Sequence, residues 1–307
     1  MTTLNFADAP LFFPITPFGQ DGTVDREALT EHISRRLEAG PGGIFPACGT
    51  GEFHALSPAE SREVVTVAAE VTSGAVPVVA GVGGSLGQVL ESVRDLTATG
   101  ADGFLLLPPY LVGGTQEGLF QYVKTVVSAT ELPVIVYHRA NARFTAETVV
   151  RLMTELPNVV GLKDGVGDVA LAQEIVLRAL SVRADALFFN GLLTAEASQA
   201  AYAAIGVPLY SSAVFAAQPE IALAFYRAYQ DGRPEVINRL LEEFYLPLVR
   251  LRDTTPGYAV SLIKAANRLR GQTVGSVRPP LVDPSPEHLQ RLEQLLDHGL
   301  AVAAELA

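Results

Sequence analysis

The sequence contains a single cysteine, Cys48, and no long hydrophobic run. One cysteine excludes a framework of internal disulfide bonds, and the five histidines show no metal-ligand spacing such as H-x-x-x-H. No apolar stretch approaches the roughly 20 residues that a membrane-spanning helix needs. The first apolar run, Leu11 to Ile15, is short and is broken by Pro14. We therefore expect no signal peptide, no membrane anchor and no structural metal, and a protein that resides in the cytoplasm.

Basic residues are also scarce. The chain has 22 Lys and Arg residues against 33 Asp and Glu residues, which gives a formal net charge of −11. Proteins that bind nucleic acid or anionic lipid usually present a basic surface, so neither class of partner is expected.

Lysine is the rarest basic residue, with only Lys124, Lys163 and Lys264. Arginine serves wherever a surface charge suffices, and a biased genome explains much of this preference. A lysine that remains is a candidate for chemistry that arginine cannot perform, such as forming an imine with a carbonyl group. The location of each lysine therefore matters.

The 307 residues are 49% hydrophobic and 18% charged, with no break in composition, which indicates one large domain or a domain with a tail. Short apolar and β-branched runs alternate eight times with segments of helical period. The predicted strands are Leu11 to Ile15, Gly43 to Pro46, Val76 to Gly81, Gly103 to Leu107, Val134 to Tyr137, Val159 to Lys163, Ala186 to Asn190 and Val207 to Ser211.

Nearly continuous apolar strands separated by helices indicate parallel pairing with both faces covered. Eight such units favour an α/β fold of the (β/α)8 TIM-barrel type over a doubly wound sheet. We predict a barrel over residues 1–232 and a C-terminal helical extension over 233–307 that packs on the barrel. Its helices are expected at 235–252, 258–270 and 286–306.

Several helix boundaries have local signals. Asp25, Ser57 and Thr145 stand where helices should begin, and Ser57 opens a capping box with proline at the first helical position. Gly40 and Gly100 stand where helices should end.

The glycine-rich segment from Gly81 to Gly87 superficially suggests a dinucleotide-binding loop. It lacks the G-x-G-x-x-G spacing and follows the third strand instead of the first, so we interpret it as a flexible turn. Neither a P-loop motif nor a G-x-S-x-G motif occurs.

Chemistry in such a barrel takes place at the carboxyl ends of the strands. Period two places Val159, Gly161 and Lys163 on one face of the sixth strand. If this face points to the barrel axis, desolvation lowers the pKa of Lys163 and makes its amine nucleophilic. A lysine extending to solvent from the strand end is the competing interpretation.

Two further segments could assist Lys163. Tyr137 ends the adjacent strand, and its hydroxyl could relay protons during imine formation, although a lone buried tyrosine is more often a core residue. After the second strand, the turn containing Gly49 and Thr50 could direct backbone amides at a carboxylate. An ordinary loop explains that turn equally well, and Glu52 within it equally suits a structural role.

These residues resemble the dihydrodipicolinate synthase and N-acetylneuraminate lyase superfamily of Schiff-base lyases. Within this superfamily, the sequence is most similar to the 5-dehydro-4-deoxyglucarate dehydratases. The resemblance spans roughly residues 8–300. It is carried by Gly49 to Phe53, Pro108 to Leu111, Gln116 to Leu119, Gly161 to Asp168, Thr194 to Glu196 and Tyr210 to Phe215.

The resemblance implies that Lys163 forms the imine, that Tyr137 relays protons, and that Gly49 and Thr50 hold the carboxylate beside the keto group. It further implies that the backbone around Gly191 lines the site. The remaining implied substrate-binding residues are Ser211, Ser212 and Arg139.

The sequence departs from the lysine-biosynthesis branch of the superfamily. That branch usually has two threonines in the loop, an aromatic side chain donated by another subunit, and an arginine five residues after the tyrosine. The corresponding residues here are Gly49 and Thr50, Leu111, and Ala142. His138 stands where the dehydratases more often have asparagine.

The resemblance therefore implies a lyase that dehydrates and decarboxylates 5-dehydro-4-deoxy-D-glucarate to 2,5-dioxopentanoate, without a cofactor or metal. Its partner is a small keto-deoxy sugar diacid, and a homotetramer or homodimer is implied. Two alternatives remain: a 2-keto-3-deoxy sugar acid aldolase that releases pyruvate, and a non-catalytic barrel that binds sugar acids as a sensor.

Overall fold

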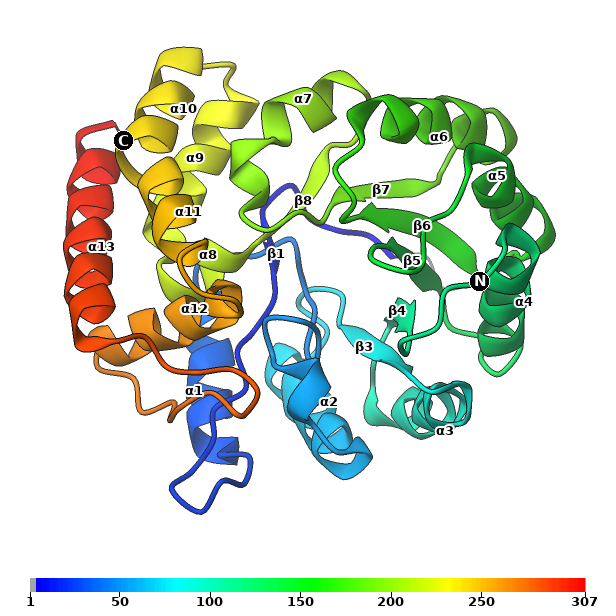
Figure 1. The fold of residues 1–307 in the computed structure, drawn as a ribbon, viewed down its shortest axis with the longest axis horizontal. Coiled ribbons are helices and arrows are strands. Elements are labelled where there is room, and N and C mark those ends of the chain that lie inside the picture. The colour runs from blue at the N-terminus through cyan, green and yellow to red at the C-terminus, as the bar shows by residue number, and fades with distance from the viewer. Residues whose placement is uncertain (1–3, 307) are drawn as a thin grey trace.

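The computed structural model describes residues 4–306, and these form a barrel of eight parallel strands surrounded by helices (Figure 1). The strands are β1 (Leu11–Phe12), β2 (Gly43–Ile44), β3 (Val79–Gly84), β4 (Gly103–Pro109), β5 (Val134–His138), β6 (Val159–Asp164), β7 (Leu187–Asn190) and β8 (Leu209–Ser212). Their order in the sheet is β2-β1-β8-β7-β6-β5-β4-β3. A parallel bridge between Ile44 and Val78 brings the two ends of the sheet together. The predicted (β/α)8 fold is confirmed.

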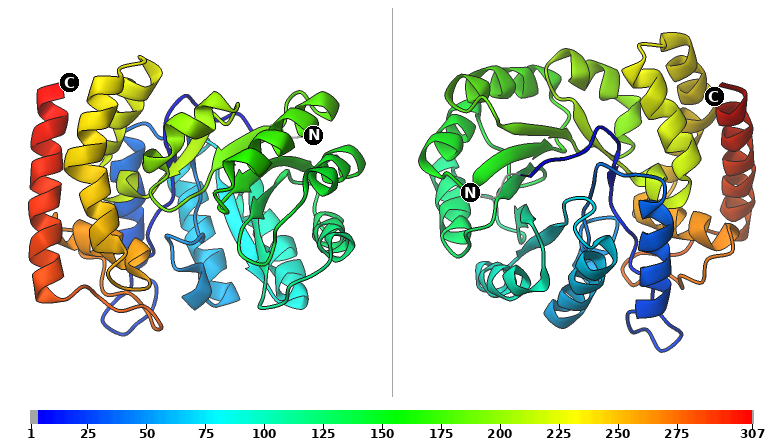
Figure 2. Two further views of the ribbon diagram at one scale, coloured as in Figure 1. Left: turned by 45° about the horizontal axis from the view of Figure 1, so that its top comes forward. Right: turned by 180° about the vertical axis from the view of Figure 1, so that it is seen from behind.

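The helices of the barrel follow the strands in sequence and cover the outside of the sheet (Figure 2). They are α1 (Arg26–Leu37), α2 (Pro58–Thr72), α3 (Leu86–Leu96), α4 (Gln116–Val127), α5 (Ala146–Glu155), α6 (Val169–Val182), α7 (Gln199–Ala204), α8 (Ala213–Ala217) and α9 (Pro219–Gln230), with short 3-10 turns η1 (Phe53–Ala55), η2 (Thr97–Thr99) and η3 (Ala195–Ala197). The predicted caps are observed: Ser57 forms a capping box with Glu60, and the side chains of Asp25 and Thr145 accept backbone N–H bonds.

The interior of the barrel is filled by side chains from the strands and from the N-terminal segment. Phe13 and Phe45 stack with ring centroids 4.5 Å apart. Leu4 and Phe6 lie against the amino-terminal ends of the strands, where a Cβ on Gly103 or Gly43 would collide with them. The N-terminal segment crosses this end of the barrel (Figure 2, right), and its side chains are buried against the strands, which leaves the carboxyl ends of the strands for a site.

Strand β3 differs from the prediction, which placed it at Val76 to Gly81 with a flexible turn after it. The observed strand is three residues later and includes the glycines. A Cβ on Gly81 would stand 2.2 Å from the Ala47 carbonyl oxygen, and the Gly81 amide donates to Pro46 at 3.0 Å. Gly81 lets β3 approach the β2 loop where the barrel closes, and Gly81 to Gly84 belong to the strand, so the flexible-turn interpretation was wrong.

Among the C-terminal helices, α10 and α13 pack beside α9, and α12 packs on α8 (Figure 1). They are α10 (Pro234–Leu240), η4 (Leu241–Tyr245), α11 (Leu246–Arg252), α12 (Tyr258–Leu269) and α13 (Pro286–Leu306). One helix was predicted over 235–252, but η4 is a π-helical segment. Pro247 explains it, because proline has no N–H and its ring crowds the preceding turn. These helices share one hydrophobic core with the barrel helices. The boundary at residue 232 stays a prediction.

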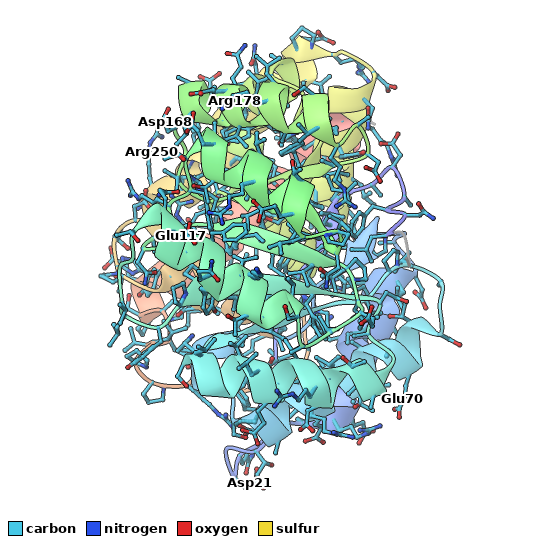
Figure 3. The ribbon with its side chains drawn as sticks, turned by 90° about the vertical axis from the view of Figure 1, so that its right-hand side faces the viewer. Asp21, Glu70, Glu117, Asp168, Arg178 and Arg250 are labelled. Carbon is cyan, nitrogen blue, oxygen red and sulfur yellow. The ribbon has the colours of Figure 1, made fainter. Side chains whose placement is uncertain are left out.

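The outer helices carry the surface charges. Figure 3 shows Glu117 on α4 and Arg178 on α6 at this face. Arg178 pairs with Glu174 at 3.0 Å, and Arg151 pairs with Glu117. Exposed pairs of this kind add little stability. Within residues 4–306, no helix is long and apolar enough to cross a membrane, and no group of three or more His, Cys, Asp or Glu side chains is arranged to hold a metal ion.

Candidate active site

A cavity of about 690 Å³ opens at the carboxyl ends of the strands. Its lining includes seven of the residues predicted for the site: Gly49, Thr50, Tyr137, Arg139, Lys163, Gly191 and Ser211. Helices α11 and α12 of the C-terminal extension also contribute to its wall, through residues such as Arg252 and Ile263. The cavity is therefore built by both the barrel and the C-terminal helices.

Lys163 lies in the wall of the cavity, at the end of β6. It pairs in register with Tyr137 of β5 and with Phe189 of β7. Its side chain points inward and is 6% exposed, with the amino nitrogen 4.0 Å from the centre of the Phe13 ring. Within residues 4–306 the amino group has no hydrogen bond and no carboxylate partner. Burial lowers the pKa of Lys163 to about 7.

Two glycines make room for the side chains of Lys163 and Tyr137. A Cβ on Gly191 would stand 2.5 Å from Cε of Lys163, and a Cβ on Gly165 would stand 2.8 Å from the Tyr137 ring. Any larger residue at either position would displace the lysine or the tyrosine. The requirement for Gly165 comes from this contact and not from a positive φ angle.

Tyr137 is held by two hydrogen bonds. Its hydroxyl donates to the carbonyl oxygen of Gly191 at 2.9 Å and accepts from Nη1 of Arg139 at 3.0 Å. Burial raises the pKa of Tyr137, while the adjacent Arg139 charge and hydrogen bond act in the opposite direction. The Lys163 amino group lies 4.7 Å from the centre of the same ring. The structure thus brings Lys163, Tyr137 and Arg139 together.

The loop after β2 presents Gly49 and Thr50 to the cavity. The carbonyls of Cys48 and Gly49 accept hydrogen bonds from the turn that follows, at 3.1 Å each. Within residues 4–306, the backbone amides of Gly49 and Thr50 donate to no protein acceptor. Gly49 is exposed and Thr50 is half-buried, and both residues line the cavity, so their amides are available to a ligand.

Ser211 and Ser212 have different environments, because adjacent residues of a strand point to opposite faces. Ser211 lines the cavity, with its hydroxyl 3.4 Å from the carbonyl oxygen of Asn190. Ser212 is fully buried outside the cavity, where its hydroxyl donates to Glu196 at 2.5 Å and caps α8. The structure therefore does not bring Ser212 to the site.

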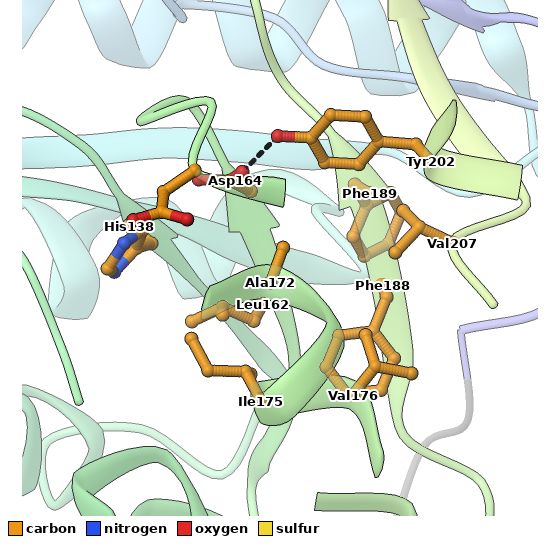
Figure 4. A pocket seen from close by; sticks show the side chains of 11 residues that line it. His138, Leu162, Asp164, Ala172, Ile175, Val176, Phe188, Phe189, Tyr202 and Val207 are labelled. Carbon is orange, nitrogen blue, oxygen red and sulfur yellow. Dashed lines mark hydrogen bonds between the residues drawn. The ribbon is translucent and has the colours of Figure 1, made fainter. Parts of the chain in front are cut away.

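A second network supports the end of β6 from the outer side (Figure 4). Asp164 accepts from the Val166 amide at 2.8 Å and from the hydroxyl of Tyr202. His138 accepts from the Phe144 amide through Nδ1 at 2.9 Å, and burial lowers the pKa of this histidine. Asp168 caps α6 through the Leu171 amide. Asp164 and Asp168 therefore stabilise loop and helix amides.

Sequence reasoning missed two features of the wall. Cys48 is buried near Lys163, and burial raises the pKa of its thiol to about 12, which leaves the thiol neutral. Arg252 comes from α11, donates to the Thr194 hydroxyl at 2.9 Å and pairs with Asp253 at 2.7 Å. Nothing in the local sequence marks Arg252, because its place depends on how the C-terminal extension packs.

The other two lysines lie elsewhere. Lys124 is exposed near the end of α4. Lys264 of α12 is fully buried and pairs with the equally buried Glu52 at 2.8 Å. Glu52 also accepts from the Arg278 amide at 2.7 Å, so it ties the β2 loop to the C-terminal extension. The structural interpretation of Glu52 is the one that its contacts support.

Comparisons with known proteins agree with this geometry. The model of the dihydrodipicolinate synthetase family matches residues 9–299. The "Probable 5-dehydro-4-deoxyglucarate dehydratase 1" of Streptomyces coelicolor is 49% identical over 98% of this chain and 96% of its own length. A protein of Bacillus licheniformis named "Probable 5-dehydro-4-deoxyglucarate dehydratase" is 42% identical over 95% and 94%.

Among solved structures, dihydrodipicolinate synthase from Oceanobacillus iheyensis aligns with a TM-score of 0.87. It is 27% identical to this chain, and the alignment covers 95% of this chain and 96% of that one. The predicted superfamily is confirmed, and the relatives carry the name of the branch that the sequence resembles. The chain belongs to the dihydrodipicolinate synthetase family.

Proposed function

We propose that this chain is a 5-dehydro-4-deoxyglucarate dehydratase that uses Lys163 to form a Schiff base with its substrate. The relatives that share 49% of its sequence carry this name. The observation that carries the proposal is the environment of Lys163, a buried amine with a pKa lowered to about 7 at the wall of a large cavity. Such an amine is substantially neutral at neutral pH and can attack a ketone.

The charge of the cavity suits a diacid. Among the described residues that line it, the basic side chains include Lys163, Arg139 and Arg252, and none is aspartate or glutamate. This is notable in a chain with a net charge of −11. Gly49 and Thr50 are placed to hold the carboxylate beside the keto group, through amides and a hydroxyl. Ser211 and the Gly191 carbonyl complete the wall near Lys163.

The first half of the reaction is dehydration. Lys163 attacks the C5 ketone, water leaves, and a protonated imine forms. The imine acidifies C4, and loss of a C4 proton gives an enamine that expels the C3 hydroxyl as water. Tyr137, or a water that it orients, moves the protons. The product of this half is an imine conjugated through C4 and C3.

The second half is decarboxylation. The C1–C2 bond breaks, carbon dioxide leaves, and its electron pair moves through C3 and C4 into the imine. Protonation of the resulting enol and enamine, followed by hydrolysis of the imine, releases 2,5-dioxopentanoate and restores Lys163. The balance is one substrate dianion and one proton giving the product monoanion, carbon dioxide and water. Lysine supplies the electrophilic catalysis, so the proposed mechanism requires no cofactor.

The products test this assignment against the aldolase and the sensor. Purified protein is incubated with 5-dehydro-4-deoxyglucarate, and the mixture is followed by NMR and by carbon dioxide release. We expect equimolar carbon dioxide and 2,5-dioxopentanoate, and neither with the Lys163→Met variant as the matched control. Released pyruvate would replace the proposal with the aldolase, and binding without turnover would replace it with the sensor.

We also infer, from the resemblance alone, that the enzyme works in the cytoplasm as a homotetramer or homodimer. Light scattering at micromolar concentration tests the second part. A mass equal to one chain would contradict it.

A further inference from the structure

The cavity holds two arginines that the chemistry at Lys163 does not use. Arg139 follows the end of β5, and Arg252 ends α11. The substrate of the proposed reaction carries a second carboxylate, C1, at the far end from the imine. A guanidinium is the side chain best suited to bind a carboxylate. The contacts of the two arginines show which of them is free to bind the C1 carboxylate.

Arg252 is already engaged within the protein. Its Nε pairs with Asp253 at 2.7 Å, and its Nη1 donates to the Leu193 carbonyl at 3.1 Å and to the Thr194 hydroxyl at 2.9 Å. The charge is therefore compensated, and two of the five N–H donors hold the loop after β7. Arg252 is better suited to building the wall than to binding a second anion.

Arg139 is not compensated. Its one side-chain hydrogen bond within residues 4–306 goes from Nη1 to the hydroxyl of Tyr137, at 3.0 Å. No carboxylate in this part of the chain pairs with it, and its other N–H groups donate to no protein acceptor. Its backbone is nevertheless fixed, because Arg139 and Ala142 exchange two hydrogen bonds across a tight turn. A half-buried guanidinium on a fixed backbone, with free donors, is a ready site for an anion.

Arg139 also lies at a suitable distance from the reacting carbon. The Lys163 amino group and the Arg139 guanidinium carbon lie 4.7 and 5.6 Å from the centre of the same Tyr137 ring. The two groups are therefore separated by no more than the sum of these distances. Four carbon–carbon bonds link C5 to C1 and span about 5 Å when extended, and the imine bond at one end and the carboxylate–guanidinium contact at the other add about 5 Å more. A substrate bound to Lys163 can thus bring its C1 carboxylate to Arg139.

We propose that Arg139 binds the distal C1 carboxylate of the substrate and selects keto-deoxy sugar diacids over monoacids. This inference rests on the proposed function, because it needs a substrate joined to Lys163. It assigns Arg139 a binding role that is separate from its bond to Tyr137. The hydrogen bond to Tyr137 links recognition of the distal carboxylate to the residue that moves protons.

The test compares a diacid with a matched monoacid. The monoacid is 2-keto-3-deoxygluconate, which keeps the keto acid end of the substrate and has a terminal CH2OH in place of the distal carboxylate. Apparent dissociation constants for imine formation are measured by borohydride trapping and intact-mass analysis over a concentration series. Arg139→Gln is expected to weaken diacid binding by about 10- to 100-fold relative to monoacid binding. The ratio of the two dissociation constants cancels any effect transmitted through Tyr137, because both ligands form an imine with Lys163 through the same keto acid end.

Arg252→Gln is the matched control, and we expect it to change the two dissociation constants by the same factor. Arg139→Lys keeps the charge without the bidentate fork and should recover part of the selectivity. An unchanged ratio in Arg139→Gln, or a diacid-selective loss in Arg252→Gln instead, would overturn the inference. If neither ligand forms an adduct with the unmodified enzyme, the proposed function fails, which is a distinguishable outcome.

Discussion

Lys163 and Lys264 are both buried, but their surroundings differ. Lys264 is fully enclosed, pairs with Glu52 at 2.8 Å, and has a pKa lowered to about 8 by burial, with Glu52 opposing the shift. Lys163 lies at a cavity wall with no carboxylate partner, and burial lowers its pKa to about 7. A carboxylate beside a buried lysine keeps it a cation and makes it structural. Without a carboxylate partner, Lys163 keeps a lowered pKa, which is the property that the proposed Schiff-base chemistry requires.

The surroundings of Lys264 also show why arginine would not suit this position. Lys264 lies over the Phe18 ring with its amino nitrogen 4.0 Å from the ring centre, in a space closed on every side. Arginine is larger and would need partners for five donors there. Arginine would therefore not fit the space that Lys264 fills.

The largest expected effect is on catalysis. Lys163→Met should lower turnover of 5-dehydro-4-deoxyglucarate by roughly 10⁴-fold or more, because no other lysine lines the cavity. Circular dichroism should show an unchanged fold. Activity within tenfold of that of the unmodified enzyme would contradict the assignment of Lys163 as the lysine that forms the imine.

Lys264→Met should instead lower the free energy of unfolding, by about 3–5 kcal/mol, because it leaves the Glu52 carboxylate buried and unpaired. Denaturant titration measures the loss. The double variant Lys264→Met with Glu52→Gln removes both charges and keeps an acceptor for the Arg278 amide, so it should recover most of the stability. A double variant no more stable than the single one would show that the pair is not what holds this region.

Replacing Lys163 should have the opposite effect on stability. The folded-state pKa of Lys163, about 7, lies below its usual value of 10.5. Between these values the unfolded chain binds more protons, so the lysine destabilises the fold at low pH and stops doing so as pH rises through this window. Lys163→Met should be more stable by about 2–4 kcal/mol near pH 7, with the difference shrinking toward pH 10.5. A constant difference across this range would contradict the depressed pKa.

A smaller effect concerns the space around the lysine. Gly191→Ala places a Cβ 2.5 Å from Cε of Lys163, so the amine must shift, and the rate of imine formation should fall by about 10- to 100-fold. Gly87→Ala is the control, because a Cβ there has no neighbour within 4 Å. Equal rates in the two variants would mean that the position of the lysine is not critical.

Much of the barrel could be predicted from sequence because apolar period and caps are local signals. Strands β4 to β7 were placed to within two residues, and period two put Lys163 and Tyr137 on facing positions. Strand β3 was misplaced because Gly81 is needed for a close contact with Ala47 in the loop after β2, and composition does not reveal such a contact. The choice between Ser211 and Ser212 depends on which face of β8 points inward. The position of Arg252 in the cavity wall depends on how the C-terminal extension packs against the barrel.

The central claim is that Lys163 carries the reaction. The direct measurement is borohydride reduction during turnover of 5-dehydro-4-deoxyglucarate, followed by intact-mass analysis and peptide mapping. The account predicts one adduct, on Lys163, with the mass of the dehydrated and decarboxylated product. An adduct on Lys124 or Lys264, or no adduct while product forms, would contradict it.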